Sequence, residues 1–331
     1  MPKYFLGESV QLGIGKETTA NTKVAPFDWI PTTSSPNIQE SLEKATLNNS
    51  IGTRSASRGE RVIRRMYNGT IASYISTRSL PLYLLSLMGT LTTSGGGVNK
   101  THAATIDKDN IVAPTLSIAL AREGADGKDY TYTGSVVNSL TFESSLDGLP
   151  TMSAEVMAVT EIEEGSKLTP AYTETLNTPF SQDNIEVKFA TNEAGLASAT
   201  AKEVNSVSAI INNSATGRPT LANKNYKAIL AGLMNATMSV EVDSNDDAYK
   251  GLFSNNTTQA ISVKWTDNDS ADIVSGVKPS VEIILPTAVL TNRTENRSMG
   301  DVTTETLEIT GHQMGSAELV KVNVINNVAS Y

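Results

Sequence analysis

The chain has 331 residues, enough for one large domain or about two of ordinary size. It has no cysteine, two histidines and a net charge of −9, which excludes disulfides and thiolate metal sites and disfavours a grip on the outside of a nucleic-acid duplex. No apolar run reaches the roughly 18 residues of a membrane helix, and the N-terminus lacks a basic start followed by an apolar core. We therefore expect a soluble protein made in the cytoplasm, with no membrane contact.

Residues 1–34 combine many glycines and prolines with isolated apolar side chains, among them Phe27 and Trp29. Prolines remove backbone donors and favour extended chain. The segment is therefore either a disordered tail or an extended arm that lies on a neighbouring subunit. In the second interpretation, Phe27 and Trp29 are buried at a subunit contact.

The pattern turns to β from about residue 38. Glu60–Thr77 predicts either two strands around an Asn68-Gly69 turn or one long strand with a bulge at the glycine. Thr90–Val112, which contains Ser94-Gly95-Gly96-Gly97, predicts a long loop.

Two short helices interrupt the strands. Leu80–Met88 follows a serine that can cap it, has a proline in its first turn and stops at Gly89. A second helix fits Asp246–Phe253. The residues expected to form the apolar surface of these flanking helices are Leu84, Leu85 and Met88 in the first, and Leu252 and Phe253 in the second.

The two halves of the chain resemble each other weakly. Residues 68–71 match residues 235–238 at an offset of 167, and the same offset places the first helix on the second. Chance matches are the alternative in a chain rich in Asn, Ser and Thr. The shared order of strands and helix favours a duplication. It divides the chain into an extended N-terminal arm (1–34), module 1 (35–160), an acidic linker (161–184) and module 2 (185–331).

No pattern indicates catalysis or a bound metal. Gly13–Thr18 lacks the spacing of a phosphate loop, and Asp243–Asp247 lacks the later glycine and glutamate of a calcium loop. His102 and His312 have no evident carboxylate or nucleophile partner, so we interpret both as surface residues. We expect no catalytic residue, no metal and no cofactor.

One cluster of charge stands out in this acidic chain, within twelve positions of each other: Arg54, Arg58, Arg61, Arg64 and Arg65. These arginines can pair with acids of the same fold, meet carboxylates of another subunit, or bind nucleic acid. Guanidinium groups suit carboxylates at interfaces, and the net charge opposes nucleic acid. We favour a ring or subunit contact.

At this point the sequence resembles the tail tube (major tail) proteins of long-tailed phages. The resemblance is a diffuse order of motifs over most of the chain. It rests on Gly15-Lys16-Glu17-Thr18-Thr19 followed by Pro26 and Trp29, the arginine-bearing strand up to Asn68-Gly69, Leu80-Pro81-Leu82-Tyr83-Leu84-Leu85, and Tyr132 to Phe142. The loop at 90–112 and the part after Leu290 match less well.

The resemblance implies a mainly β fold: two tail-tube-like β-sandwich or half-barrel modules, each with a short flanking helix. Strands of neighbouring subunits would join into a ring-shaped β-barrel, and rings would stack into a tube. Because one-unit members form hexameric rings, a duplicated chain would form a trimeric pseudo-hexamer. The resemblance also implies tail terminator, tape measure and tail-tip partners, and a place in the virion tail after assembly in the host cytoplasm.

The implied function is structural and not enzymatic: a channel for genome delivery, through which double-stranded DNA passes without specific binding. An acidic lumen would repel the DNA backbone and let it slide. A surface-layer or adhesin-type β protein is the alternative, although it should carry a secretion signal. A carbohydrate-processing enzyme would need paired carboxylates in an aromatic cleft, and aromatic residues are only 5% of the chain.

Overall fold

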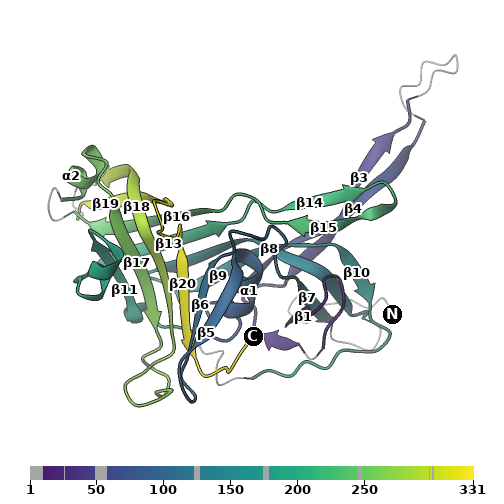
Figure 1. Cartoon of the computed structure of the whole chain (residues 1–331), viewed down its shortest axis with the longest axis horizontal. Helices are drawn as coiled ribbons and strands as arrows, with labels where there is room; N and C mark the ends of the chain where they lie inside the picture. Colours follow the sequence, from purple (N-terminus) through teal and green to yellow (C-terminus); the bar gives the residue numbers. More distant parts are fainter. Residues whose placement is uncertain are drawn as a thin grey trace.

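The computed structural model describes residues 10–25, 27–48, 58–122, 127–173, 179–244, 248–297, 299 and 302–331. This part of the chain is mainly β, as predicted, with two α-helices (Figure 1). Neither described helix is long and apolar enough to cross a membrane.

The first half contains β1 (Val10–Lys16), β2 (Asp28–Ile30), β3 (Asn37–Thr46), β4 (Glu60–Tyr74), α1 (Leu80–Met88), β5 (Gly89–Ser94), β6 (Lys100–Ile106), β7 (Leu116–Arg122), β8 (Tyr130–Ser145), β9 (Thr151–Ala158) and β10 (Thr160–Glu163). The second half contains β11 (Ile185–Ala190), β12 (Ala201–Lys202), β13 (Val204–Asn212), β14 (Thr216–Thr220), β15 (Asn223–Leu230), β16 (Asn235–Asp243), α2 (Ala248–Ser254), β17 (Gln259–Thr266), β18 (Ser280–Asn296), β19 (Thr304–Gly311) and β20 (Lys321–Asn326). Two 3₁₀ turns, Gln182–Asn184 and Glu193–Ala197, flank β11.

The strand pairings of the first half recur in the same order in the second. The first half has the antiparallel pairs β1–β2, β1–β7, β7–β8, β8–β10, β8–β9, β9–β4 and β4–β3. The second half has β11–β12, β11–β17, β17–β18, β18–β20, β18–β19, β19–β16 and β16–β13. The two helices stand at the same place in this order, after β4 and after β16.

One central sheet joins the halves, because β13 pairs with the C-terminal part of β8. Its strand order is β3–β4–β9–β8–β13–β16–β19–β18. The long strands β8 and β18 each leave this sheet: their N-terminal parts pair in outer sheets, β8 with β7 and β10, and β18 with β17 and β20. Figure 1 shows β17, β18 and β20 crossing the direction of β13 and β16.

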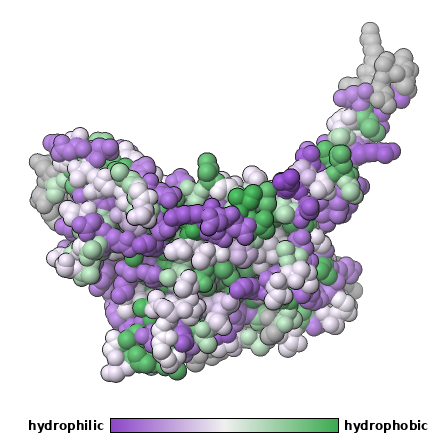
Figure 2. All heavy atoms as spheres, in the orientation of Figure 1, coloured by the Kyte–Doolittle hydropathy of each residue, from purple (hydrophilic) through white to green (hydrophobic). Residues whose placement is uncertain are grey.

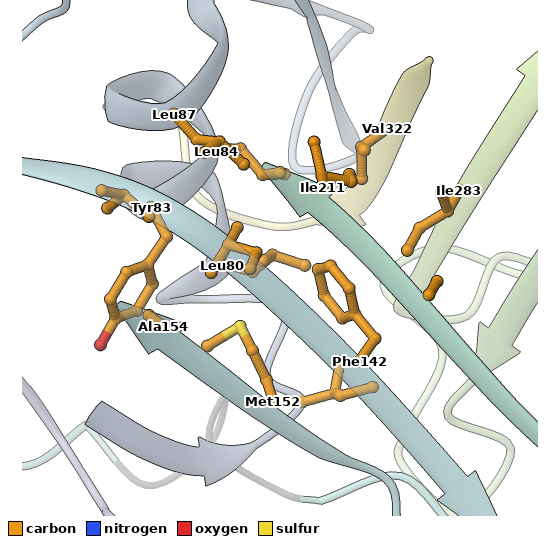
Figure 3. Close-up of a cluster of buried hydrophobic side chains, with 14 of the residues drawn as sticks. Leu80, Tyr83, Leu84, Leu87, Phe142, Met152, Ala154, Ile211, Ile283 and Val322 are labelled. Atoms are coloured by element: carbon orange, nitrogen blue, oxygen red, sulfur yellow. The ribbon is translucent and has the colours of Figure 1, made fainter. Parts of the chain in front are cut away.

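The largest hydrophobic core contains side chains of both halves. Leu80, Tyr83, Leu84 and Leu87 of α1 lie against Phe142 and Met152, beside Ile211, Ile283 and Val322 (Figure 3). Trp265 of the second half stacks on Phe142 and donates a hydrogen bond to Ser144 Oγ (2.9 Å). Packing of this kind ties the two halves together, while the predicted boundaries of two separate modules stay a prediction.

The predicted Asn68-Gly69 hairpin turn is wrong. The alternative of one long strand is confirmed, but the bulge expected at the glycine is absent, since the register shifts between Glu43 and Lys44 and not at Gly69. β4 runs unbroken through Gly69 because β3 and β9 pair with it on both sides. A Cβ added to Gly69 would lie 2.0 Å from the carbonyl oxygen of Asn37. The glycine therefore permits close backbone approach rather than a turn.

The predicted loop at 90–112 is also wrong. Residues 89–106 form the β5–β6 hairpin, in which Gly95 and Gly97 have positive φ, and β6 pairs with β20 of the second half. His102 of β6 is buried, not a surface residue: Asn326 Oδ1 lies 2.9 Å from Nε2 and Thr93 Oγ1 lies 2.9 Å from Nδ1. Burial lowers the pKa of His102. The exposed position of His312 is confirmed.

Residues 10–30 do not extend away from the chain. β1 pairs with β2 and β7, so the expectation of an arm is wrong for the described part of this segment. The physical reason is burial, because the side chains of Leu12 and Ile14 in β1 are fully buried in the largest hydrophobic core. Part of the predicted linker lies across these strands, since Tyr172 bridges to Trp29 and its hydroxyl donates to Gln11 Oε1 (3.1 Å).

Each half has a hairpin between two paired strands of the central sheet: between β3 and β4 in the first half, and between β13 and β16 in the second. The segment that joins β13 to β16 forms β14–β15, here called the docked hairpin (residues 216–230), which lies over the first half. The distal parts of β3 and β4, here called the projecting hairpin (residues 40–48 and 58–66), leave the body of the molecule (Figure 1). Its tip lies outside the described residues.

Candidate functional surface on the central sheet

One face of the central sheet is polar and bears acids without bases. Its other face is apolar and packs into the core, because side chains alternate along each strand. None of the strands β8, β9, β13, β16 and β19 contains a lysine or an arginine. The acids on the polar face are Glu143, Glu155, Glu241 and Glu308, among Thr and Ser side chains. Along these five strands, a polyanion that approaches the polar face meets only negative and neutral groups.

Hydroxyl and amide donors of neighbouring strands hold these carboxylates. Thr304 Oγ1 donates to Glu241 Oε1 (2.8 Å), and Ser239 Oγ donates to Glu308 Oε1 (3.3 Å). Asn138 Nδ2 donates to Glu155 Oε2 (3.3 Å). Neutral donors orient an acid while leaving its charge uncompensated, so the face keeps its negative potential.

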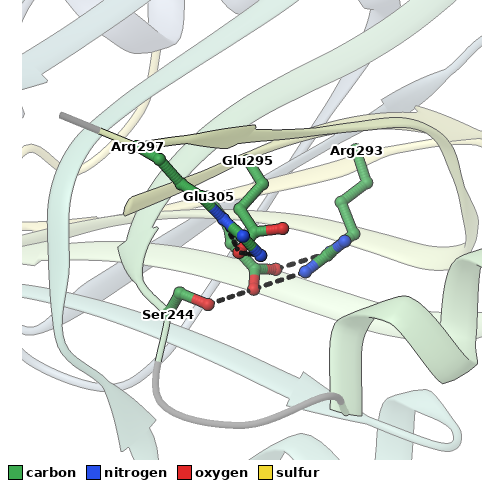
Figure 4. Close-up of polar contacts among 5 residues, drawn as sticks. All are labelled: Ser244, Arg293, Glu295, Arg297 and Glu305. Carbon is green, nitrogen blue, oxygen red and sulfur yellow. Dashed lines mark hydrogen bonds and ion pairs between the residues drawn. The ribbon is translucent and has the colours of Figure 1, made fainter. Parts of the chain in front are cut away.

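The one arginine within β18 points to the other face of this sheet. Arg293 of β18 makes two hydrogen bonds to the buried Glu305 of β19, 2.7 Å from Nε and 2.6 Å from Nη2 (Figure 4). Ser244 Oγ adds a third bond (2.5 Å). These hydrogen bonds, from Arg293 first, hold the pKa of Glu305 below its usual range although burial opposes them. Alternation places Glu305 in phase with Leu307 and Ile309 and so on the buried face, but no local pattern identifies Arg293 of another strand as its partner.

The arginine cluster lies on the projecting hairpin, apart from the acids of the polar face. Arg64 Nη1 pairs with Glu43 (3.0 Å) and Arg65 Nη1 with Glu40 (3.3 Å), both across the hairpin and both exposed. Among the described residues, Arg58 and Arg61 have no carboxylate within ion-pair distance. Arg54 lies outside the described residues.

The other predicted contact residues pack within their own chain. Phe27 meets Trp29 edge-on, and Trp29 is buried against Ala119 and Ala121 of β7. A buried indole leaves little surface for a neighbouring subunit.

The two helices differ in exposure. In α1, Leu84, Leu85 and Met88 are all buried. In α2, Leu252 is half-buried and Phe253 is exposed. Only the first helix is therefore enclosed within its own chain.

Aspartates that could in principle bind a cation are engaged in hydrogen bonds and ion pairs within the chain. Asp267 accepts a hydrogen bond from the backbone of Ser270, and Asp272 accepts one from Gly276 and pairs with Lys278. Asp243 accepts from Asn205 Nδ2 (2.8 Å), while Asn245 and Asp247 lie outside the described residues. Within the described ranges, no group of three or more His, Asp or Glu side chains is placed to hold a metal ion.

A family model described as phage tail tube protein matches residues 7–312 of the 331. The chain belongs to the phage tail tube protein family. No curated protein matches the chain. Tail tube membership confirms the resemblance inferred from the motifs and assigns the protein a structural role in the tail of the virion. A structural role also fits the polar sheet face, which carries acids among neutral side chains.

Proposed function

We propose that three copies of this chain form a closed ring, that rings stack into the tail tube, and that the polar face of the central sheet lines the channel through which double-stranded DNA passes. The role is structural, without catalysis. Tail terminator, tape measure and tail-tip proteins are the expected partners at the ends and in the lumen of the tube. Assembly in the host cytoplasm precedes incorporation into the virion.

The contact between the two halves supports the ring. Ser206–Asn212 of β13 pair with Ser139–Ser145 of β8, so the second half adds its sheet to the sheet of the first. In the recurring strand order, β3 takes the place of β13 and β18 takes the place of β8. A second copy can therefore present β3 to β18 in the way that β13 meets β8.

Both edges needed for this contact are free. Among the described residues, β3 pairs only with β4, and the part of β18 from Val289 to Asn296 pairs only with β19. Open sheet edges promote further strand pairing, and a closed barrel removes them. Two half-units per chain and closed cyclic symmetry give three chains for a six-unit ring.

The concave side of the molecule supports the position of the channel. Figure 2 shows its upper edge hollowed between the lobe that carries α2 and the projecting hairpin. A channel lined with Lys or Arg would bind phosphates repeatedly along many rings. The base-free strands of the central sheet avoid this.

Electron cryomicroscopy of the purified protein tests the proposal. We expect tubes whose rings contain three chains, with Glu143, Glu155, Glu241 and Glu308 facing the lumen. Six chains per ring would overturn the stoichiometry and leave the tube intact. A protein that stays monomeric at millimolar concentration, or a lumen formed by the arginines of the projecting hairpin, would overturn the proposed function.

A further inference from the structure

We propose that the projecting hairpin of one copy docks on the second half of the next copy in the same ring, in the way that the docked hairpin already lies on the first half within each chain. This inference rests on the proposed ring and names the surfaces that meet. The partner is a second copy of this chain.

The docked hairpin shows what such a contact looks like. Ile229 of β15 is 2% exposed and packs with Ala113, Val136 and Val159 of the first half. The backbone N–H of Ala231 donates to Ile111 O (2.8 Å), and β15 touches β4 at Arg65. A hairpin that connects two strands of one half thus covers an apolar patch on the neighbouring half.

The projecting hairpin has the same origin, and its only strand partner among the described residues is β15, which meets it near its base at Arg65. It continues β3 and β4, the strands that correspond to β13 and β16. Leu42 and Ile63 are 40% and 42% exposed, and they are followed by Leu47 at 38%. Leu42 pairs with Arg65, and the register then shifts from Glu43–Arg64 to Lys44–Val62, so Ile63 lies in a β-bulge two positions from Arg65. Solvent-exposed apolar side chains grouped on an extended hairpin mark an interaction surface.

The second half offers the matching surface. Val156 of β9 and Ile309 of β19 correspond, because the register shifts of β8 and β18 place the pair Ser139–Glu155 where the second half has Asn292–Glu308. Three residues further on, Val159 is covered by the docked hairpin, whereas His312 is exposed, and Met314, two positions later, is 55% exposed. Beside His312 lies a cavity of about 550 Å³ between the halves, lined by Met88 and Ile106 of the first half and by Leu233, Met234 and Leu319 of the second. Leu233 at its rim is 89% exposed.

The position of β3 connects this contact to the ring. The projecting hairpin continues β3, and the free edge of β3 would pair with β18 of the next copy. In that copy, β18 runs beside β19, and β19 leads to Met314. Pairing of β3 with β18 would therefore place the cavity of the next copy on the side toward which the hairpin extends. Charge does not oppose the contact, since Arg64 and Arg65 are already paired within the hairpin.

A double variant tests the contact: Leu42→Ser with Ile63→Ser. The matched control is Leu221→Ser, which removes an apolar side chain from the exposed turn of the docked hairpin. We expect the control to assemble like the wild type. The double variant should fold, judged by circular dichroism, but need at least about tenfold more protein to form tubes, because burial of one such side chain is worth a factor of ten or more in association.

Cross-linking identifies the partner surface. Because the chain has no cysteine, Ile63→Cys combined with Met314→Cys creates the only thiol pair. After oxidation, the cross-linked products of the tubes should contain no more chains than one ring. Each variant with a single cysteine should yield no such products. Longer ladders would show contacts between rings and overturn the proposal.

The controls separate this inference from the proposed function. If the wild type forms no tubes, the proposed function fails. If the wild type and the double variant assemble equally, or the paired cysteines do not cross-link in well-formed tubes, the docking of the hairpin is wrong while the tube stands.

Discussion

The two halves of this tail tube protein share an order of strands but not a pattern of burial. In the first half, α1 is wholly enclosed and the β5–β6 hairpin reaches across to β20. In the second half, α2 has no fully buried residue and β17 follows it after a short connection. The hairpins show the reverse: that of the second half is docked and that of the first projects. The first half is therefore built to receive its neighbour, and the second half is left open.

This difference has a consequence for assembly. The contact between halves within a chain has three strand pairings, β8–β13, β6–β20 and the short β4–β15 contact, and a shared apolar core. In the proposed ring, a contact between chains would lack the pairing that β5–β6 makes within a chain, because α2 is followed directly by β17. We therefore expect such a ring to separate between chains before the two halves of one chain separate.

The buried ion pair of the second half should give the largest difference between the halves. Arg293→Ala leaves Glu305 buried and without its partner, which costs about 3–5 kcal/mol of unfolding free energy. Arg64→Ala removes the exposed pair with Glu43 in the first half and should cost less than about 1 kcal/mol. Urea unfolding followed by tryptophan fluorescence measures both. Equal losses would show that the two pairs do not differ in burial in solution.

The helices provide the second comparison. Leu84 of α1 is fully buried, so Leu84→Ala should cost about 2–5 kcal/mol. Leu252 of α2 is half-buried in the single chain, and Leu252→Ala should cost well under half as much. Thermal unfolding of the monomer provides the measurement. A larger loss for Leu252→Ala would mean that α2 is as enclosed as α1.

Gly69 and Ala236, which match in the sequence at the offset of 167, give the third comparison. Gly69→Ala places a methyl group against the backbone of Asn37, and the strands must separate, at a cost of about 1–3 kcal/mol. Ala236→Gly keeps the strand and should cost about 0.5–1 kcal/mol through added chain entropy. Urea midpoints of the two variants decide the order. The opposite order would show that β3 can shift away from β4 at little cost.

The smallest effect is the pH dependence that Glu305 adds. Its pKa is lowered in the folded protein, so the unfolded chain takes up a proton at a higher pH than the folded chain does. The stabilisation is therefore complete above the usual carboxyl pKa and is lost as the pH falls through the lowered value. Glu305→Gln should flatten the fall in unfolding free energy on acidification below about pH 4.5. Parallel curves for the variant and the wild type would contradict this.

Local signals in the sequence were sufficient for several elements. The proline and glycine around Leu80–Met88 define α1 to the residue, since Gly89 takes a positive φ where the helix ends. The predicted serine cap is wrong, because the side chain of Ser79 makes no capping hydrogen bond. The family resemblance likewise followed from the order of such motifs.

Other features depend on partners far away in the chain. Asn68-Gly69 signals a turn by itself, and only β3 and β9 on either side make it part of a strand. His102 reads as a surface residue in a glycine-rich segment until Asn326, more than 200 positions later, gives it a partner. The β5–β6 hairpin is stable because β20 extends it, which no local window contains.

The sequence by itself determined the acidic, cysteine-free composition and the alternation that makes the strands two-faced. The tertiary structure decided which faces meet. It gathered the acids of four distant strands on one side of a single sheet, turned Arg293 to the other side, and buried one hairpin while leaving the other exposed. The physical reason is that strand pairing and burial depend on non-local contacts, whereas turns, caps and alternation act over a few residues.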